Sequence, residues 1–130
     1  AKAAELVGAA GDVAAAAKDV NGVAYVGHRA DGANGGDVRT LALDIRGRMP
    51  KDRPAVVVVI GTADDKASAV VALNEAAQAR GLSASTFVGL VGDMIGGRGG
   101  GKADVAQGGG TDVSAIPAAL TAVENAIGAA

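Results

Sequence analysis

Apolar side chains recur with the period of an α-helix in four stretches of the chain. The longest covers residues 2–19, where apolar positions fall at i, i+4, i+7, i+8 and i+11 and alanine supplies helix propensity. Comparable stripes predict amphipathic helices over residues 36–48 and 83–95, and a last helix that begins after Asp112 or Ser114. We expect each helix to pack its apolar stripe against a common core.

Four shorter runs between these helices favour β-strands. Residues 55–61 are the clearest, because Ala-Val-Val-Val-Val-Ile-Gly is β-branched and lacks polar alternation, as expected of a strand covered on both faces. Residues 22–29 and 105–107 predict two short strands. Residues 66–73 predict an antiparallel partner of the first run, with a helix extending through Arg80 as the alternative. The pattern predicts an α/β fold in which a mixed β-sheet is packed with helices.

A glycine-rich segment separates the last two predicted helices. Residues 96–110 contain eight of the 21 glycines, together with Arg98 and Lys102. Glycine is costly to order, so this density indicates a loop whose backbone is approached closely, most naturally by an anion such as a phosphate. A P-loop is rejected because Ala103 stands where a hydroxyl would hold Mg²⁺, and a dinucleotide GxGxxG motif fails because its third glycine position is Lys102. A flexible linker remains the alternative.

This segment supplies the candidate binding residues. They are Gly97, Arg98, Gly99, Gly100, Gly101, Lys102 and Gln107. The Gln107 amide could reach a base or a ribose hydroxyl, or could instead be buried and brace the loop. Asp104 is expected to orient Lys102 or the loop backbone. Arg39, Arg46 and Arg48 could extend the contact, although nothing in the sequence directs them to one face.

The composition and charge of the chain limit the kinds of ligand and metal site that it can have. The net charge of −2 limits any contact with a polyanion to a local patch. Tyr25 and Phe87 are the only aromatic residues, which argues against base recognition by aromatic stacking. The chain has no cysteine and one histidine, so we expect no His- or Cys-based metal site and no cofactor. It has neither a signal-peptide layout nor a long apolar run, which favours a cytoplasmic protein without membrane association. Its start at Ala-Lys-Ala is compatible with a fragment of a longer protein.

The segment from Gly96 to Asp112 reads Gly-Gly-Arg-Gly-Gly-Gly-Lys-Ala-Asp-Val-Ala-Gln-Gly-Gly-Gly-Thr-Asp. It resembles the signature of the C-terminal domain of the alanyl-tRNA synthetases, a member of the DHH-associated domain group, and the resemblance extends over residues 12–128. It implies a non-catalytic domain that contacts the elbow of tRNA, with tRNA-Ala and the rest of the synthetase chain as the expected partners. It also implies that the domain helps to couple aminoacylation with editing. By the same resemblance, residues 1–20 are expected to be the end of a helical linker and residues 21–130 to form the globular domain.

Two other functions are compatible with this resemblance. The first is a dimerisation module, in which the N-terminal helix or a sheet edge pairs two chains. The second is an accessory nucleic-acid-binding domain of the DHH phosphoesterase type. Those enzymes commonly carry a histidine directly after the glycines, where this chain has Lys102, and their Asp-His-His core is missing here.

Overall fold

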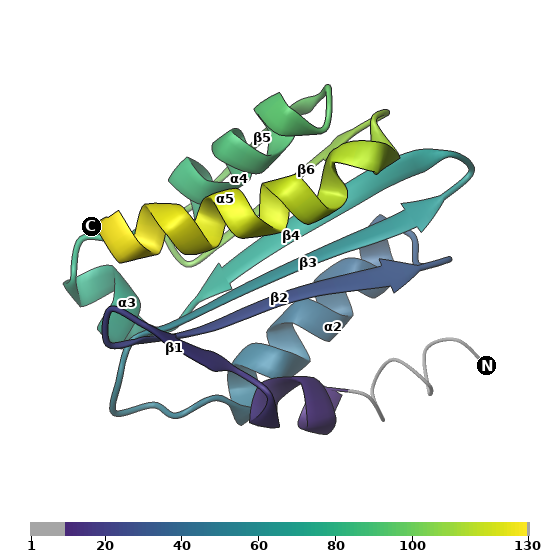
Figure 1. Cartoon of the computed structure of the whole chain (residues 1–130). Helices are drawn as coiled ribbons and strands as arrows, with labels where there is room; N and C mark the ends of the chain where they lie inside the picture. The colour runs from purple at the N-terminus through teal and green to yellow at the C-terminus, as the bar shows by residue number, and fades with distance from the viewer. Residues whose placement is uncertain (1–9, 130) are drawn as a thin grey trace.

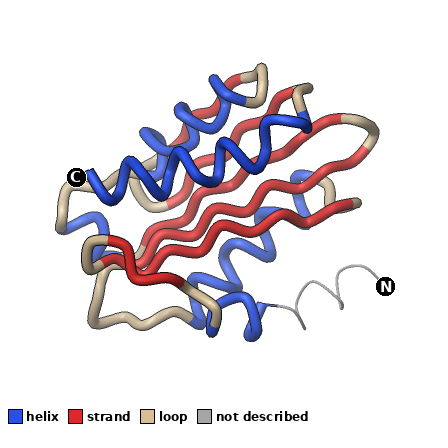
Figure 2. The backbone as a smooth tube through the Cα atoms, in the orientation of Figure 1, coloured by secondary structure: helices blue, strands red, loops and turns tan. Residues whose placement is uncertain are grey.

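The computed structural model describes residues 10–129, which form one six-stranded mixed sheet with helices on both faces (Figures 1 and 2). The strands are β1 (Lys18–Val20), β2 (Val23–Asp31), β3 (Ala55–Ala63), β4 (Lys66–Leu73), β5 (Arg98–Gly101) and β6 (Val105–Gly110). The helices are α2 (Gly35–Arg48), α3 (Glu75–Ala79), α4 (Ala84–Met94) and α5 (Ile116–Ala129), with a 3₁₀ turn η1 (Val113–Ala115) and a short helical segment at residues 10–15. The predicted α/β fold with a mixed sheet is confirmed.

The strands lie in the order β1-β2-β3-β4-β6-β5. Only β2 and β3 are parallel, and α2 makes the crossover between them, as a parallel pair requires. All other neighbours are antiparallel. The β3–β4 connection is a two-residue turn at Asp64 and Asp65, which both have positive φ, as tight hairpins require.

The sheet separates two apolar cores. On one face α4 and α5 pack their apolar stripes, including Val88, Val91 and Val123, against β2, β3 and β4. On the other face α2 contributes Leu41 and Ile45. β3 lies between both cores, and its residues 55–60 are fully buried, which confirms the prediction of a strand covered on both faces.

The predicted helix over residues 2–19 is wrong at its C-terminal end. Residues 18–20 form β1, which pairs with the start of β2 through a tight turn at Asn21 and Gly22, both with positive φ. Asn-Gly is a strong hairpin signal, and it prevails here over the helical spacing of the preceding alanines. The first residues of that predicted helix, 2–9, lie outside the described part of the chain. The helical alternative for residues 66–73 is also wrong, because they form β4 and the helix begins only at Glu75.

Tyr25, the only tyrosine of the chain, joins β2 to α5. Its phenol is buried, and its Oη donates a 2.7 Å hydrogen bond to the Leu120 carbonyl. Burial raises the pKa of Tyr25 well above the ordinary phenol value, and the Glu124 carboxylate raises it further.

The shift of Tyr25 predicts a loss of stability in alkali. The unfolded phenol ionises near pH 10.0, whereas the folded one resists ionisation. Its contribution to stability is therefore complete below that pH and is lost as the pH rises further. We expect tyrosinate absorbance to appear only together with the loss of circular dichroism. The Tyr25→Phe variant should unfold about 1 kcal/mol more easily at neutral pH and show a weaker decline in alkali. Tyrosinate formation in a fully folded protein would contradict this expectation.

Candidate nucleic-acid interface

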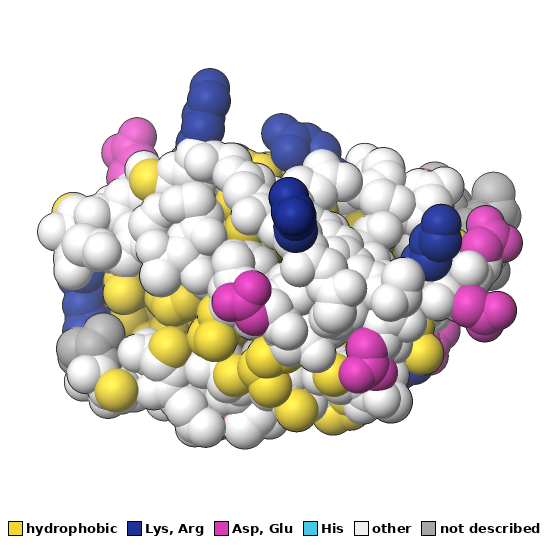
Figure 3. Space-filling view, turned by 90° about the horizontal axis from the view of Figure 1, so that it is seen from above, with side chains coloured by type: hydrophobic (Ala, Val, Ile, Leu, Met, Phe, Trp, Pro, Cys, Tyr) yellow, Lys and Arg dark blue, Asp and Glu magenta, His cyan; other side chains and the backbone are white. Residues whose placement is uncertain are grey.

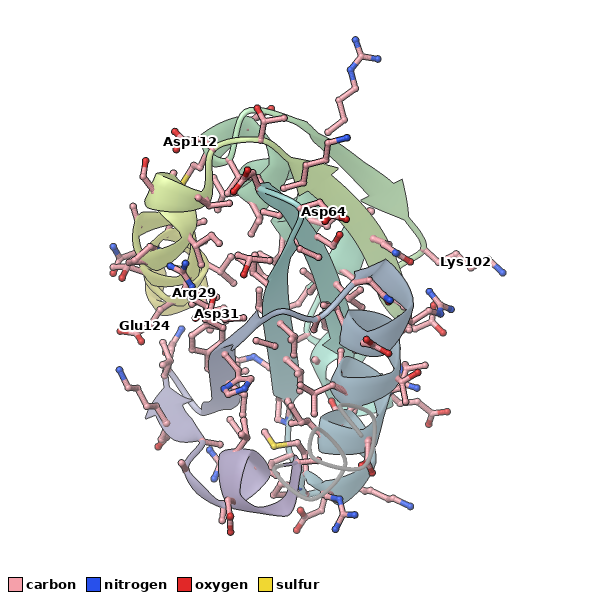
Figure 4. The ribbon with its side chains drawn as sticks, turned by 90° about the vertical axis from the view of Figure 1, so that its right-hand side faces the viewer. Arg29, Asp31, Asp64, Lys102, Asp112 and Glu124 are labelled. Carbon is pink, nitrogen blue, oxygen red and sulfur yellow. The ribbon has the colours of Figure 1, made fainter. Side chains whose placement is uncertain are left out.

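The glycine-rich segment forms a β-hairpin at one edge of the sheet, not a loop. Arg98–Gly101 make up β5, the edge strand, and Val105–Gly110 make up β6, which pairs with both β5 and β4. The prediction of a loop, and its alternative of a flexible linker, are therefore wrong for most of this segment. The predicted strand at residues 105–107 is confirmed and extends to Gly110. Lys102 follows β5 in the hairpin turn, and its side chain projects outward (Figure 4).

Most of the hairpin glycines are needed by close packing inside the protein itself. A Cβ on Gly99 would lie 2.9 Å from the Val88 carbonyl oxygen of α4, and one on Gly108 would lie 2.5 Å from the Arg98 carbonyl oxygen. Gly97 and Gly110 are similarly closed by backbone atoms of neighbouring segments. The close approach inferred from the sequence thus exists, but the chain's own backbone makes it.

Gly100 is different, because an added Cβ there would meet nothing within 4 Å. Side chains alternate along a strand, so Gly100 and Arg98 face away from α4, toward the side of the sheet that carries α2. Gly100 pairs in register with Gln107, which is exposed and stands on the same face. The alternative of a buried Gln107 amide is therefore wrong. The Gln107 Nε2 atom lies 3.1 Å from the position of a Cβ on Gly35, the first residue of α2. This neighbour, 72 positions away by subtraction of the residue numbers, gave no signal in the sequence.

The two faces of the sheet differ in charge. On the face that α4 and α5 cover, these two helices contain no lysine or arginine, and their only charged residues are Asp93 and Glu124. Seen from this side, charged side chains are scattered over a largely neutral surface (Figure 3). On the opposite face, α2 packs against β3 and β4 and carries three arginines together with Asp37 and Asp44, and the hairpin strands that continue the sheet beyond β4 bear Arg98. A polyanion would find its cations on the α2 side.

The three arginines of α2 do not share one direction. Arg39 and Arg46 are seven residues apart and lie on the same side of the helix. The Arg46 Nη1 atom donates to the Leu73 carbonyl at 3.4 Å, which places this side next to β4. Arg48 lies about half a turn away and pairs with Asp44, with 3.2 Å between Nε and Oδ1. The structure therefore brings Arg39 and Arg46, but not Arg48, toward the hairpin side.

The remaining ion pairs lie away from the hairpin. They are Lys18–Glu124, Arg29–Asp31 and Arg53–Asp19. Within residues 10–129, the side chains of Arg98 and Lys102 make no ion pair. Asp104 accepts a 2.9 Å hydrogen bond from the Val105 amide through Oδ1, so its carboxylate braces the backbone of the turn, as one of the two predicted roles requires.

The perturbed titratable groups on β2 also lie outside this region. The Arg29 guanidinium and the Thr62 hydroxyl hydrogen-bond to Asp31 and lower the pKa of its carboxyl. Burial lowers the pKa of His28. Arg29 and Asp31 stand on the opposite side of the molecule from Lys102 in Figure 4. None of these groups contributes charge to the hairpin face.

Two further properties bear on the kind of site. In the part of the chain that the structure describes, no three His, Cys, Asp or Glu side chains come together in a way that could hold a metal ion. None of the helices between residues 10 and 129 combines the length and the apolar character needed to cross a membrane. The cationic side chains and exposed backbone of the hairpin therefore define the candidate site.

The fold and this hairpin are those of a known family. The family model for the DHHA1 domain matches residues 19–129, and the chain belongs to the DHHA1 domain family. Within it, the chain is of the C-Ala type, the C-terminal domain of bacterial alanyl-tRNA synthetases. The resemblance expected from the glycine-rich signature is thereby confirmed.

The relatives support this assignment in sequence and in structure. The chain is 60% identical over 124 residues to the alanine–tRNA ligase of Nocardioides sp. and 47% identical over 127 residues to that of Thermobifida fusca. These matches cover 95% and 97% of this chain, which spans only 14% of the length of each relative. The crystal structure of the C-Ala domain from Aquifex aeolicus alanyl-tRNA synthetase matches with a TM-score of 0.69 at 26% identity, over 82% of this chain and 90% of that one.

A more distant structure shares the fold alone. It is a DHH domain described as a member of the s1p family of ribosomal proteins, with a TM-score of 0.59 and 13% identity. That match covers 94% of this chain and 30% of the other. It extends the likeness to a DHH-containing protein without bearing on what this chain binds.

Proposed function

We propose that this domain binds tRNA at its elbow through the α2-side face of the β5–β6 hairpin. The observation that carries the proposal is the charge distribution. Arg98 and Lys102, which form no ion pair among the described residues, flank this face together with Arg39 and Arg46 of α2, whereas α4 and α5 carry no lysine or arginine. Gly100 leaves the backbone accessible there, and Gln107 can donate and accept hydrogen bonds. Of the seven hairpin residues predicted from the sequence, Arg98, Gly100, Lys102 and Gln107 would make the contacts, with Arg39 and Arg46 beside them. Gly97, Gly99 and Gly101 would shape the hairpin that presents these residues.

The role that we propose within a synthetase is positional and non-catalytic, and it needs no cofactor. The domain would hold one tRNA, in the cytoplasm, while the rest of the alanyl-tRNA synthetase chain charges and proofreads it. The residues that precede β1 would then join the globular part to those other domains, so the boundary would lie a few residues before the predicted one at residue 20, because residues 18–20 belong to the sheet. The similarity to the Aquifex aeolicus C-Ala domain supports this proposal.

The test is a titration of labelled tRNA-Ala with this chain at two salt concentrations, beside a minihelix that lacks the elbow. We expect binding to the whole tRNA and much weaker binding to the minihelix. Equal binding to both would place the contact on the acceptor arm and overturn the assignment to the elbow.

The Arg98→Ala/Lys102→Ala double variant tests the hairpin. Each phosphate contact that is lost should reduce the salt slope of binding by about 0.7 to 0.9. Both side chains are exposed, so we expect the fold to remain intact. The Lys18→Ala variant, which removes one charge on β1, is the control. Unchanged affinity in a folded double variant would move the RNA surface away from the hairpin.

One observation favours self-association as a second function. β1 pairs only with residues 23–25 of β2, and the outer edge of β2 from Val26 to Asp31 has no strand partner among residues 10–129. Free strand edges can pair with another chain. Size measurement by light scattering without RNA tests this candidate, and a monomer at all concentrations would exclude it as a function of this chain.

A further inference from the structure

A groove opens beside the proposed site, between the C-terminal half of α2, the start of α3 and the hairpin turn. The groove is lined by Arg46, Gly47, Lys51, Leu73, Asn74, Glu75, Gln78 and Asp104. Asp104 belongs to the same turn as Lys102, so the groove continues from the hairpin toward the loop that follows α2. Nothing in the sequence places Lys51 near the glycine-rich segment, because β3, β4, α3 and α4 lie between them along the chain.

The cations of this groove differ from their neighbours in having no acidic partner. Arg48 and Arg53, which flank Lys51 in the sequence, are neutralised by Asp44 and Asp19. Arg46 and Lys51 form no ion pair within the described part of the chain. Arg48 and Arg53 are thus neutralised by acidic partners, whereas the positive charges of Arg46 and Lys51 are not, so an anion in the groove can interact with them.

The groove also contains two acidic residues, Asp104 and Glu75. Asp104 accepts a hydrogen bond from its neighbouring backbone amide. Glu75 lies in the first turn of α3, where a carboxylate is favourable. They keep the groove from being strongly positive, so an anion must lie close to Arg46 and Lys51 to gain from their charge.

The loop that carries Lys51 is held in place. The Asn74 side chain donates hydrogen bonds from Nδ2 to the carbonyls of Pro50 and Arg53, at 3.0 and 2.8 Å. Lys51 therefore extends from a loop that is anchored at both ends. A cation on a fixed backbone loses less entropy on binding a phosphate than one on a mobile loop.

We propose that this groove binds the phosphodiester backbone of RNA, with Arg46 and Lys51 as anion-binding residues that extend the hairpin site. The proposal rests on the tRNA-binding function proposed above. The RNA strand passes from the hairpin turn along α2, and Lys51 contacts a phosphate beyond those that the hairpin reaches. Because the contact is to the RNA backbone, its removal should weaken binding to the same extent for different RNA sequences and leave base preference unchanged.

The matched pair Lys51→Ala and Arg53→Ala tests the groove. Both variants remove one positive charge from the same loop, but Arg53 is already paired with Asp19 at 3.0 Å. In titrations of tRNA at several salt concentrations, we expect Lys51→Ala to weaken binding about three- to tenfold. It should also lower the salt slope by about 0.7 to 0.9. Arg53→Ala should change neither beyond a small effect of net charge.

Protection from lysine acetylation provides an independent readout on the unmodified sequence. Bound tRNA should protect Lys51 and Lys102, while Lys18, which is paired with Glu124 on the far side of the sheet, should react equally with and without RNA. Equal behaviour of the two loop variants, with Lys51 unprotected while tRNA is bound, would overturn the groove and leave the proposed function standing. Failure of the unchanged chain to bind tRNA would overturn both.

Discussion

The Gly97→Ala variant should lose at least about 3 kcal/mol of unfolding free energy, the largest effect that we expect of any single methyl group added to this domain. The added Cβ would overlap the Gly109 carbonyl oxygen and lie 2.6 Å from the Gly110 Cα atom. These are backbone atoms of β6, and Gly109 and Gly110 are in register with Ser68 and Ala67 of β4. Relief of the overlap would require the hairpin to move away from the sheet.

The matched control for this variant is Gly100→Ala in the same hairpin. A Cβ at Gly100 meets nothing within 4 Å, and its φ is not positive. We expect its stability to stay within about 0.5 kcal/mol of the parent. Urea unfolding followed by circular dichroism measures both variants. Similar midpoints for Gly97→Ala and the parent would show that the hairpin tolerates displacement, contrary to the packing described here.

The Asn74→Ala variant should lose about 2 to 4 kcal/mol, because one side chain makes four hydrogen bonds to backbone groups. Its Oδ1 accepts from the amides of Ala55 and Ala77, each at 2.9 Å. The first bond holds the start of β3 and the second caps α3, while Nδ2 holds the loop from Pro50 to Arg53. Loss of a helix cap alone costs about 0.5 to 2 kcal/mol.

Two further variants separate the contributions of Asn74. Asn74→Asp keeps both acceptor bonds, but its second carboxylate oxygen would face the carbonyl oxygens of Pro50 and Arg53 in place of a donor. We therefore expect it to lose at least as much stability as Asn74→Ala, which would show that the donor bonds to the loop are needed. Gln78→Ala removes one 3.3 Å bond to the Asn74 carbonyl and should cost less than about 1 kcal/mol. Equal unfolding midpoints for Asn74→Ala and Gln78→Ala would refute the assignment of Asn74 as the link between these segments.

The effect of Asn74→Ala on RNA binding depends on the groove. The variant frees the loop that carries Lys51 but leaves the charges of Arg98 and Lys102 unchanged. We therefore expect a folded Asn74→Ala protein to bind tRNA less tightly with a nearly unchanged hairpin contribution.

Much of the fold follows from local patterns in the sequence. The helical stripes over residues 36–48 and 83–95 correspond to α2 and α4, because periodic apolar positions leave a helix one way to bury them. The continuous apolar run at residues 55–61 corresponds to β3. Where two local signals competed, at residues 18–22, the choice depended on whether the segment could pair with β2, which the alanine spacing alone does not show.

In the candidate site, too, the sequence determined some features and the tertiary structure determined others. By itself, the sequence determined the family, through the spacing of glycines, Arg98, Lys102 and Gln107, and it determined that a backbone had to be approached closely, because so many glycines are costly without a reason. Only the tertiary structure decided what makes that approach: α4 and β6 close on most of these glycines, and Gly100 alone in β5 faces open space. It also decided that Arg46 and Lys51 share a groove while Arg48 and Arg53 are neutralised. These outcomes depend on contacts between segments far apart in the chain, and no local pattern of residues encodes which distant backbone or carboxylate will lie beside a given side chain.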